Sequence, residues 1–266
     1  MKFSGKGIIV TGSNSGIGKA TALLFAKQGA SVLIHGRNLD RLEQTVAECK
    51  QIGAENAKFP MVQGDFREKE IIPKLVQTAV DEFGRIDVLV NNAGENPSSS
   101  LLTGTEEDFD RLINMALKPQ IFLSQRCFPE LKKTCGNIVS VSSFAAARPT
   151  NLDWSFVTVA HAGLNQFTQC AAIEFGSDGV RVNAVCPGFV KTLAPVKQGD
   201  LSVEELDGFY ENVSQYVPIK RLGTAEETAK LIVYLASDDA SMMNGACIVQ
   251  DGGHSLMGLD KQTMKI

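Results

Sequence analysis

A short apolar stretch followed by a glycine-rich loop constrains this chain most. Residues 8–18 read Ile-Ile-Val-Thr-Gly-Ser-Asn-Ser-Gly-Ile-Gly, and a helical pattern of apolar residues follows them. Gly12 permits a tight turn, Gly16 lets the backbone approach a phosphate, and Gly18 lets the helix pack on the strand. The free N–H groups at the start of such a helix bind a pyrophosphate. We therefore expect dinucleotide contacts along this loop, from Gly12, Ser13, Asn14, Ser15, Gly16, Ile17 and Gly18.

Short apolar segments alternate with longer helical segments along the chain, which is typical of a parallel sheet covered on both faces. We expect strands at residues 8–11, 31–35, 58–63, 87–90, 137–141, 181–185 and 247–250. We expect helices at residues 18–28, 39–51, 70–83, 106–132, 154–175 and 225–236. This pattern predicts one doubly wound, Rossmann-like α/β domain over residues 1–266.

Residues 191–216 are the least regular part of the chain, and they follow the sixth expected strand. Ligands of open parallel sheets bind beyond the carboxyl ends of the strands. The segment is therefore either a lid over a substrate or an ordinary surface loop.

Composition argues against several classes of partner. The chain has 26 Lys and Arg against 30 Asp and Glu, a net charge of −4, so we expect no nucleic-acid partner. No run approaches the ~18 apolar residues of a membrane span. Six cysteines without CxxC spacing predict reduced, mostly buried thiols, and three histidines without HExxH predict no metal site. With no signal peptide before the first strand, we expect a cytoplasmic protein.

The end of the second expected strand bears on the choice of cofactor. Folds that prefer NAD place an acid there, near the ribose 2′-hydroxyl. Here the sequence is His35-Gly36-Arg37, and Gly36 fills the acidic position. Arg37 could bind a 2′-phosphate, which favours NADP(H) while NAD(H) stays possible. The alternative is a solvated surface arginine.

Three motifs in order give the chain a resemblance to a known family. Residues 11–18, then Asn91-Asn92-Ala93-Gly94, then Pro187-Gly188 resemble the short-chain dehydrogenase/reductase family over nearly the whole chain. The resemblance implies NAD(P)(H) binding, interconversion of small-molecule alcohols and carbonyls, and a homo-tetramer or dimer. It also implies that Asp65 lies near the adenine, that Asn91, Ala93 and Gly94 shape the floor of the cofactor site, and that Pro187, Gly188 and Thr192 lie beside the nicotinamide.

The catalytic set of that family is degraded in this sequence. Members use a Ser that steadies the substrate oxygen, a Tyr that transfers the proton, and a Lys four residues later. Ser143 matches the Ser. Aligned from residues 162–164, the Tyr position is Val157 and the Lys position is His161. The commoner Ser-to-Tyr spacing would give Phe156 and Ala160 instead. Neither alignment finds a Tyr or a Lys between residues 143 and 190.

The fourth member of the family's set is an Asn on the preceding helix. That position matches Ala116, and Asn114, two residues earlier, is a second candidate. Three of the four positions are therefore replaced. Positioned acid–base groups contribute ~10²–10⁴-fold to rates, so their loss predicts a pseudoenzyme that keeps the cofactor fold.

Two alternatives remain open. One is an active NADP(H)-dependent oxidoreductase that uses Ser143 with His161, whose ordinary pKa of ~6.5 suits proton transfer. In that case Tyr210 or Tyr216, in or beside the possible lid, could also reach in, whereas Tyr234 lies elsewhere. The other is a non-enzymatic sensor of the cofactor ratio, or a scaffold. His161 could equally be a structural histidine.

Overall fold

A seven-stranded parallel sheet organises the chain. The computed structural model describes residues 1–97, 100–148, 154–198 and 201–257. Seven strands pair in the order β3-β2-β1-β4-β5-β6-β9, and every pair is parallel. Their bounds are β1 Gly7–Val10, β2 Ser31–Gly36, β3 Met61–Gln63, β4 Val88–Asn91, β5 Asn137–Val141, β6 Arg181–Pro187 and β9 Cys247–Gln250. The predicted Rossmann-like sheet is confirmed.

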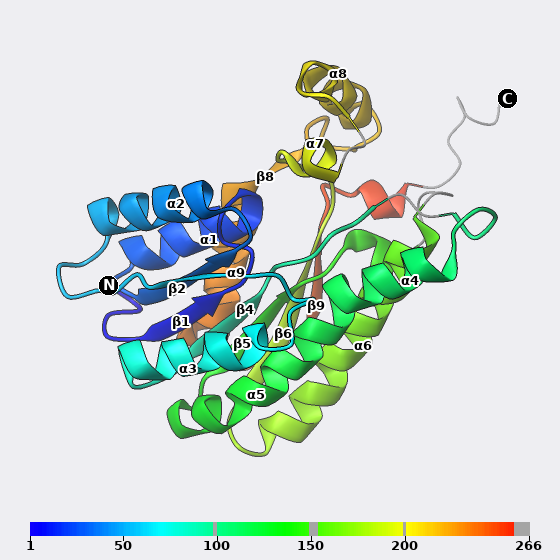
Figure 1. The fold of residues 1–266 in the computed structure, drawn as a ribbon. Helices are drawn as coiled ribbons and strands as arrows, with labels where there is room; N and C mark the ends of the chain where they lie inside the picture. The colour runs from blue at the N-terminus through cyan, green and yellow to red at the C-terminus, as the bar shows by residue number, and fades with distance from the viewer. Residues whose placement is uncertain (98–99, 149–153, 199–200, 258–266) are drawn as a thin grey trace, which may run out of the picture.

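Helices cover both faces of this sheet because the side chains of its strands alternate. In β1, Ile8 and Val10 face one layer while Ile9 faces the other, and all three are fully buried. Figure 1 shows α1, α2 and α9 on one face and α3, α5 and α6 on the other. Their bounds are α1 Gly16–Lys27, α2 Leu39–Ile52, α3 Ile71–Phe83, α5 Lys118–Thr134, α6 Ser155–Gly176 and α9 Ala225–Ala236.

The single helix expected over residues 106–132 is wrong in detail. The structure has α4 at Glu106–Leu112, a π-helical turn at Ile113–Leu117, and then α5. A π turn widens the helix and breaks the usual backbone pattern. The side chain of Gln120 compensates, since its Nε2 donates to the Ala116 carbonyl at 2.8 Å. Hydrophobic periodicity does not reveal such a turn, because the apolar face continues through it.

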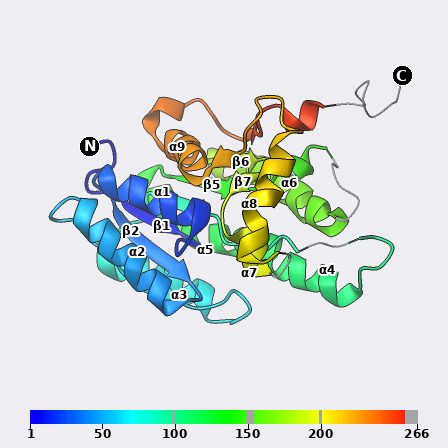
Figure 2. The ribbon, with the colours of Figure 1, turned by 90° about the horizontal axis from the view of Figure 1, so that it is seen from above.

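The segment 191–216 is more regular than its sequence suggests. It holds α7 at Ala194–Gln198 and α8 at Val203–Ser214. A reciprocal capping box between Ser202 and Glu205 starts α8. A short parallel pair, β7 Val190–Lys191 with β8 Gly223–Thr224, closes the base of the segment. Figures 1 and 2 show α7 and α8 outside the two helical layers.

The six cysteines are all free thiols, but the prediction that most are buried is only half right. Three are buried, Cys247 is half-buried, and Cys135 and Cys170 are exposed. Within the described ranges, no helix is long and apolar enough to cross a membrane. The same residues contain no group of three potential metal ligands.

Candidate functional site

The glycine loop between β1 and α1 is packed too tightly for side chains at its key positions. Gly12 and Gly16 have φ angles of +64° and +54°, which favour glycine. A Cβ at Gly18 would lie 2.4 Å from the Gly12 carbonyl oxygen and 2.4 Å from Asn92 Nδ2. Asn92 in turn donates from Nδ2 to the Thr11 carbonyl at 2.8 Å. The loop is therefore fixed against the end of β4.

The amino end of α1 is prepared for an anion. Its N-cap residue, Ser15, makes no side-chain capping hydrogen bond, and the first turn contains no acid. Backbone N–H groups and the positive end of the helix dipole therefore face the loop. These observations fit a pyrophosphate, as the sequence predicted.

Two side chains of the loop have other tasks. The Ser13 hydroxyl is buried, donates to the Val10 carbonyl at 2.8 Å and accepts from the His35 N–H at 2.9 Å. These two hydrogen bonds connect the loop to β2. Asn14 lies against Gly36, where a Cβ would be 2.5 Å from the amide carbon of Asn14. Asn14 thus takes the space next to the position where NAD-preferring folds place their acid.

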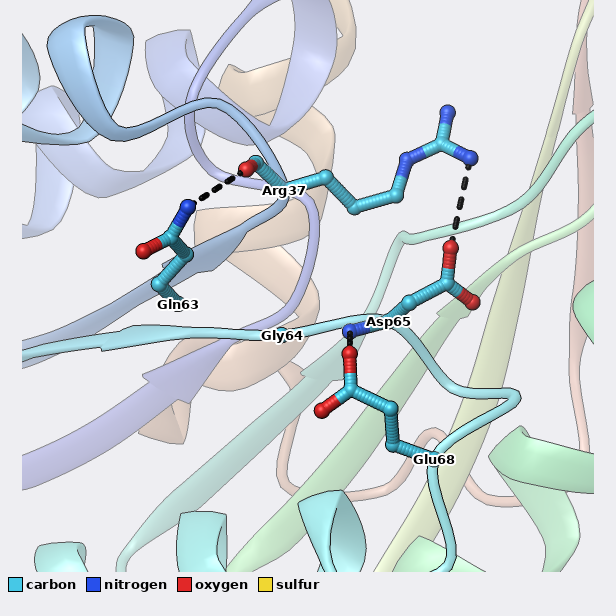
Figure 3. Close-up of a pocket in the computed structure, with 5 residues that line it drawn as sticks. All are labelled: Arg37, Gln63, Gly64, Asp65 and Glu68. Atoms are coloured by element: carbon cyan, nitrogen blue, oxygen red, sulfur yellow. Dashed lines mark hydrogen bonds and ion pairs between the residues drawn. The ribbon is translucent and has the colours of Figure 1, made fainter.

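Beside β2 and β3 lies an open pocket of about 350 Å³. Figure 3 shows its lining, with the Arg37 side chain extended over Asp65. Asp65 accepts two hydrogen bonds from the guanidinium of Arg67, at 2.6 and 3.0 Å. These bonds lower the pKa of Asp65 to about 2, so its carboxylate is charged at neutral pH. The pocket lies where the sequence predicted the adenosine end of the cofactor, and its lining residues are Arg37, Gln63, Gly64, Asp65 and Glu68.

Arg37 is bound between two carboxylates. Its Nη1 lies 2.7 Å from Glu95 Oε1 and 3.4 Å from Asp65 Oδ2. The other carboxylate oxygen of Glu95 lies 2.9 Å from Arg111 Nη2. The sequence analysis missed Glu95, although it directly follows the motif at residues 91–94. The solvated-arginine alternative for Arg37 is therefore only partly apt, since the side chain is 54% exposed but doubly paired.

The motif at residues 91–94 joins β4 to β1. The Thr11 hydroxyl oxygen accepts from the backbone N–H groups of Asn92 and Ala93, both at 3.0 Å. Asn91 is buried and donates from Nδ2 to the Ser124 hydroxyl at 2.9 Å. Ala93 lies directly beside the place where a Cβ on Gly12 would stand. The motif thus borders the glycine loop, as expected for the floor of a cofactor site.

The predicted nicotinamide side also reaches the glycine loop. Gly188 packs on Asp251, whose Cβ would lie 2.7 Å from a Cβ at Gly188. Thr192, four residues farther along, has its Cγ2 3.4 Å from the position of a Cβ on Gly16. Pro187 ends β6 and is buried in the sheet. Thr192 and Gly16 therefore lie side by side although they are far apart in the sequence.

The residues predicted at the Tyr and Asn positions belong to one apolar cluster. Val157, at the predicted Tyr position, is buried together with Ala116, at the predicted Asn position. Leu112 and Ala160 complete the buried part, and Trp154 and Phe156 pack against it. Phe156 and Ala160, the residues of the other alignment, belong to the same cluster, so both alignments place the predicted Tyr position near Ala116. None of these side chains offers a proton.

Ser143 precedes a short 3₁₀ helix at Phe144–Ala146 and acts as its N-cap. Its Oγ accepts from the Ala145 N–H at 3.2 Å, and the residue is buried. The hydroxyl can still donate one hydrogen bond. The next residue, Phe144, packs edge-on against His254, with ring centroids 5.3 Å apart.

His161 is buried one turn along α6 from Val157. Its Nε2 lies 2.8 Å from Asn96 Oδ1, and its Nδ1 is a buried atom with no hydrogen-bond partner among the described residues. Burial lowers the pKa of His161 from 6.5 to about 4. The ring is therefore neutral at pH 7, and the tautomer with its proton on Nε2 can donate to the Asn96 oxygen.

No tyrosine comes close to replacing the missing one. The Tyr210 hydroxyl donates to the Thr192 carbonyl at 2.5 Å and accepts from the Thr192 N–H at 3.0 Å. Tyr216 is 63% exposed, and Tyr234 lies on the outer side of α9 at 42% exposure. All three belong to the described ranges, and the structure shows none of them bonded to Ser143 or His161.

We expect the chain to lose stability in mild acid. Burial lowers the pKa of both His161 and His35 to about 4, from 6.5 in the unfolded chain. Between pH 6.5 and 4 the unfolded chain binds protons that the folded chain does not, so the free energy of unfolding falls as the pH falls. Each histidine should contribute about 2 kcal/mol to the loss between pH 7 and 5.

Denaturant titrations at several pH values measure this loss. The variant His161→Gln should reduce the pH slope by about half, whatever its effect on absolute stability. His254→Gln, at a half-buried ring, should leave most of the slope in place. An unchanged slope in His161→Gln would show that His161 is not the group that titrates.

Comparisons with known proteins agree with the motifs. A family model described as enoyl-(acyl carrier protein) reductase matches residues 11–255. An uncharacterised oxidoreductase of Thermotoga maritima is 38% identical over 261 residues, which cover 95% of this chain and 98% of the relative.

Solved structures give the same result. A short-chain dehydrogenase/reductase of unknown function from Caenorhabditis elegans, solved with cofactor, has a TM-score of 0.94 at 32% identity and covers 99% of both chains. A short-chain dehydrogenase from Burkholderia cenocepacia, in complex with NADP, has a TM-score of 0.85 at 28% identity and covers 96% of this chain and 99% of the other. Sequence motifs, sheet order and these matches agree, and the chain belongs to the short-chain dehydrogenase/reductase family.

Proposed function

We propose that this chain binds NADP(H) and that its ordinary alcohol and carbonyl oxidoreduction is impaired or lost. The observation that carries the proposal is the apolar cluster at the catalytic positions. Val157 and Ala116 are buried there in one apolar cluster with Leu112, where the family's reaction needs a proton donor and a polar relay. NAD(H) remains the alternative cofactor.

Support for cofactor binding comes from this chain's own residues. The amino end of α1 would hold the pyrophosphate with backbone N–H groups, and no acid in its first turn opposes an anion. Arg37 would meet a 2′-phosphate beside the pocket that contains Asp65. When bound, the cofactor would supply hydride chemistry, and the protein would supply orientation and exclusion of water.

Support for impaired catalysis comes from proton transfer. A general acid must have a pKa near the working pH, and burial lowers the pKa of His161 to about 4. Its Nε2 is also held by Asn96. Ser143 keeps a hydroxyl that can polarise a carbonyl, but polarisation without a proton donor leaves the reaction incomplete.

A sensor of the cofactor ratio is a second candidate, favoured by the contact between Tyr210 and Thr192. Both hydrogen bonds connect α8 to Thr192, whose side chain lies beside Gly16 of the glycine loop. Binding of the cofactor at the glycine loop would then alter the position of α8 within the segment 191–216. In this role the segment acts as a lid.

We also propose a homo-oligomer in the cytoplasm. Several large apolar side chains are exposed on α5, α6, α9 and β9 of the isolated chain, which is typical of surfaces that pair with another copy. They are Phe122, Val159, Ile173, Tyr234 and Val249. Free thiols at all six cysteines fit a reducing compartment.

Calorimetric titration of the purified chain with NADPH and with NADH tests the proposal. We expect binding of both, with the tighter binding for NADPH. Tighter binding of NADH would assign Arg37 to a surface role. Binding of neither would overturn the proposed function and direct attention to protein partners.

A further inference from the structure

The ion pair between Arg37 and Glu95 joins the segments that follow β2 and β4. Arg37 follows β2 and Glu95 follows β4, and the sheet order places β1 between these two strands. The glycine loop starts at the end of β1. A pair whose atoms approach to 2.7 Å from strands on either side of β1 therefore spans the loop.

Glu95 is the more buried partner in two ion pairs, one with Arg37 and one with Arg111. Its side chain is 14% exposed, whereas Arg37 and Arg111, which hold its two oxygens, are each more than half exposed. The carboxylate is thus fixed against the protein, and the two guanidinium groups are held from the solvent side. On the side of the pocket, Arg37 also pairs with Asp65, which pairs in turn with Arg67.

We infer that Glu95 is a specificity-determining residue, which sets how strongly the chain prefers NADP(H) by competing with the 2′-phosphate for Arg37. The inference rests on the proposed cofactor binding. The guanidinium group of Arg37 can pair fully with Glu95 or with an arriving phosphate, but not with both. Binding of the phosphate therefore costs the charge-assisted bond between Arg37 and Glu95. A cofactor with a 2′-hydroxyl does not require Arg37 to leave Glu95.

Arg111 acts in the opposite direction. It holds the second oxygen of Glu95 at 2.9 Å and therefore keeps that carboxylate paired when Arg37 turns to a phosphate. Without Arg111, Glu95 would have to hold Arg37 or remain an uncompensated, largely buried charge. Glu95 and Arg111 are thus predicted to have effects of opposite sign on the same preference.

The test compares probes that differ only in the 2′-phosphate. Binding of NADPH and NADH, and of 2′,5′-ADP and 5′-AMP, is measured by calorimetry for the whole chain and for Glu95→Gln and Arg111→Gln. Glu95→Gln should tighten binding of the 2′-phosphate probes by about threefold to tenfold and change binding of the others little. Arg111→Gln should weaken binding of the 2′-phosphate probes alone.

The control is Glu130→Gln, which removes the same charge from a surface pair with Lys133 on α5. It should leave all four affinities unchanged. Equal effects of Glu95→Gln on probes with and without the 2′-phosphate would overturn the inference while leaving cofactor binding intact. If the unmodified chain binds none of the probes, the proposed function fails, and the role of Glu95 fails with it.

Discussion

The variant Gly18→Ala should bind either dinucleotide at least about 100-fold more weakly than the unmodified chain. The added Cβ would stand 2.4 Å from the Gly12 carbonyl oxygen and from Asn92 Nδ2, distances that no relaxed structure keeps. The loop must therefore move away from α1. Loss of two hydrogen bonds from backbone N–H groups to a charged phosphate costs about 3 kcal/mol or more, which corresponds to that factor.

The measurement is calorimetric titration, with thermal melting to check that the variant is folded. Gly208→Ala is the matched control, because nothing lies within 4 Å of a Cβ at that position on α8. It should bind like the unmodified chain. A folded Gly18→Ala chain with unchanged affinity would place the dinucleotide site somewhere other than the glycine loop.

Turnover of simple ketones and alcohols with NADPH or NADP should be about 10²–10⁴-fold slower than in a family member that keeps the Tyr and the Lys. The reason is local. Val157 and Ala116 have no protons to exchange, and His161 is neutral and bonded to Asn96. A substrate screen against such a family member, measured in parallel, checks this expectation.

Two variants make the screen decisive. His161→Ala should leave any residual rate unchanged, because the histidine transfers no proton. Val157→Tyr alone should not restore activity. A tyrosine ring is larger than the valine side chain that it replaces, and overpacking of the apolar cluster costs about 1–3 kcal/mol of stability. Robust turnover that disappears in His161→Ala would instead establish a catalytic histidine.

Much of the fold follows from local patterns. Strands such as β1 and β4 are short, apolar runs buried on both faces, and helices such as α2 keep a regular apolar side, so both could be predicted within a few residues. The break at the π turn could not, because the apolar face of the helix continues through it. Nor could α8, whose amphipathic pattern was hidden by the acids and glycine around it.

The site divides in the same way. Gly12, Gly16 and Gly18 have roles that follow from backbone geometry and could be assigned from the sequence. For Ser13, a predicted cofactor contact, only the tertiary structure shows that its buried hydroxyl bonds to the Val10 carbonyl and to the His35 N–H. Glu95 went unnoticed because its partners, Arg37 and Arg111, are far from it in sequence.

The link between Tyr210 and Thr192 has a consequence for tolerance to sequence change. Both hydrogen bonds end on backbone atoms of Thr192, so the side chain at position 192 takes no part in them. The side chain at position 192 can therefore vary while both hydrogen bonds from Tyr210 to its backbone are kept. Apolar packing of Leu206 and Tyr210 in a cluster with Leu222 also holds α8. The two hydrogen bonds depend on one phenolic oxygen, and a Phe at position 210 would fit the same space yet leave the twelve-residue helix without them.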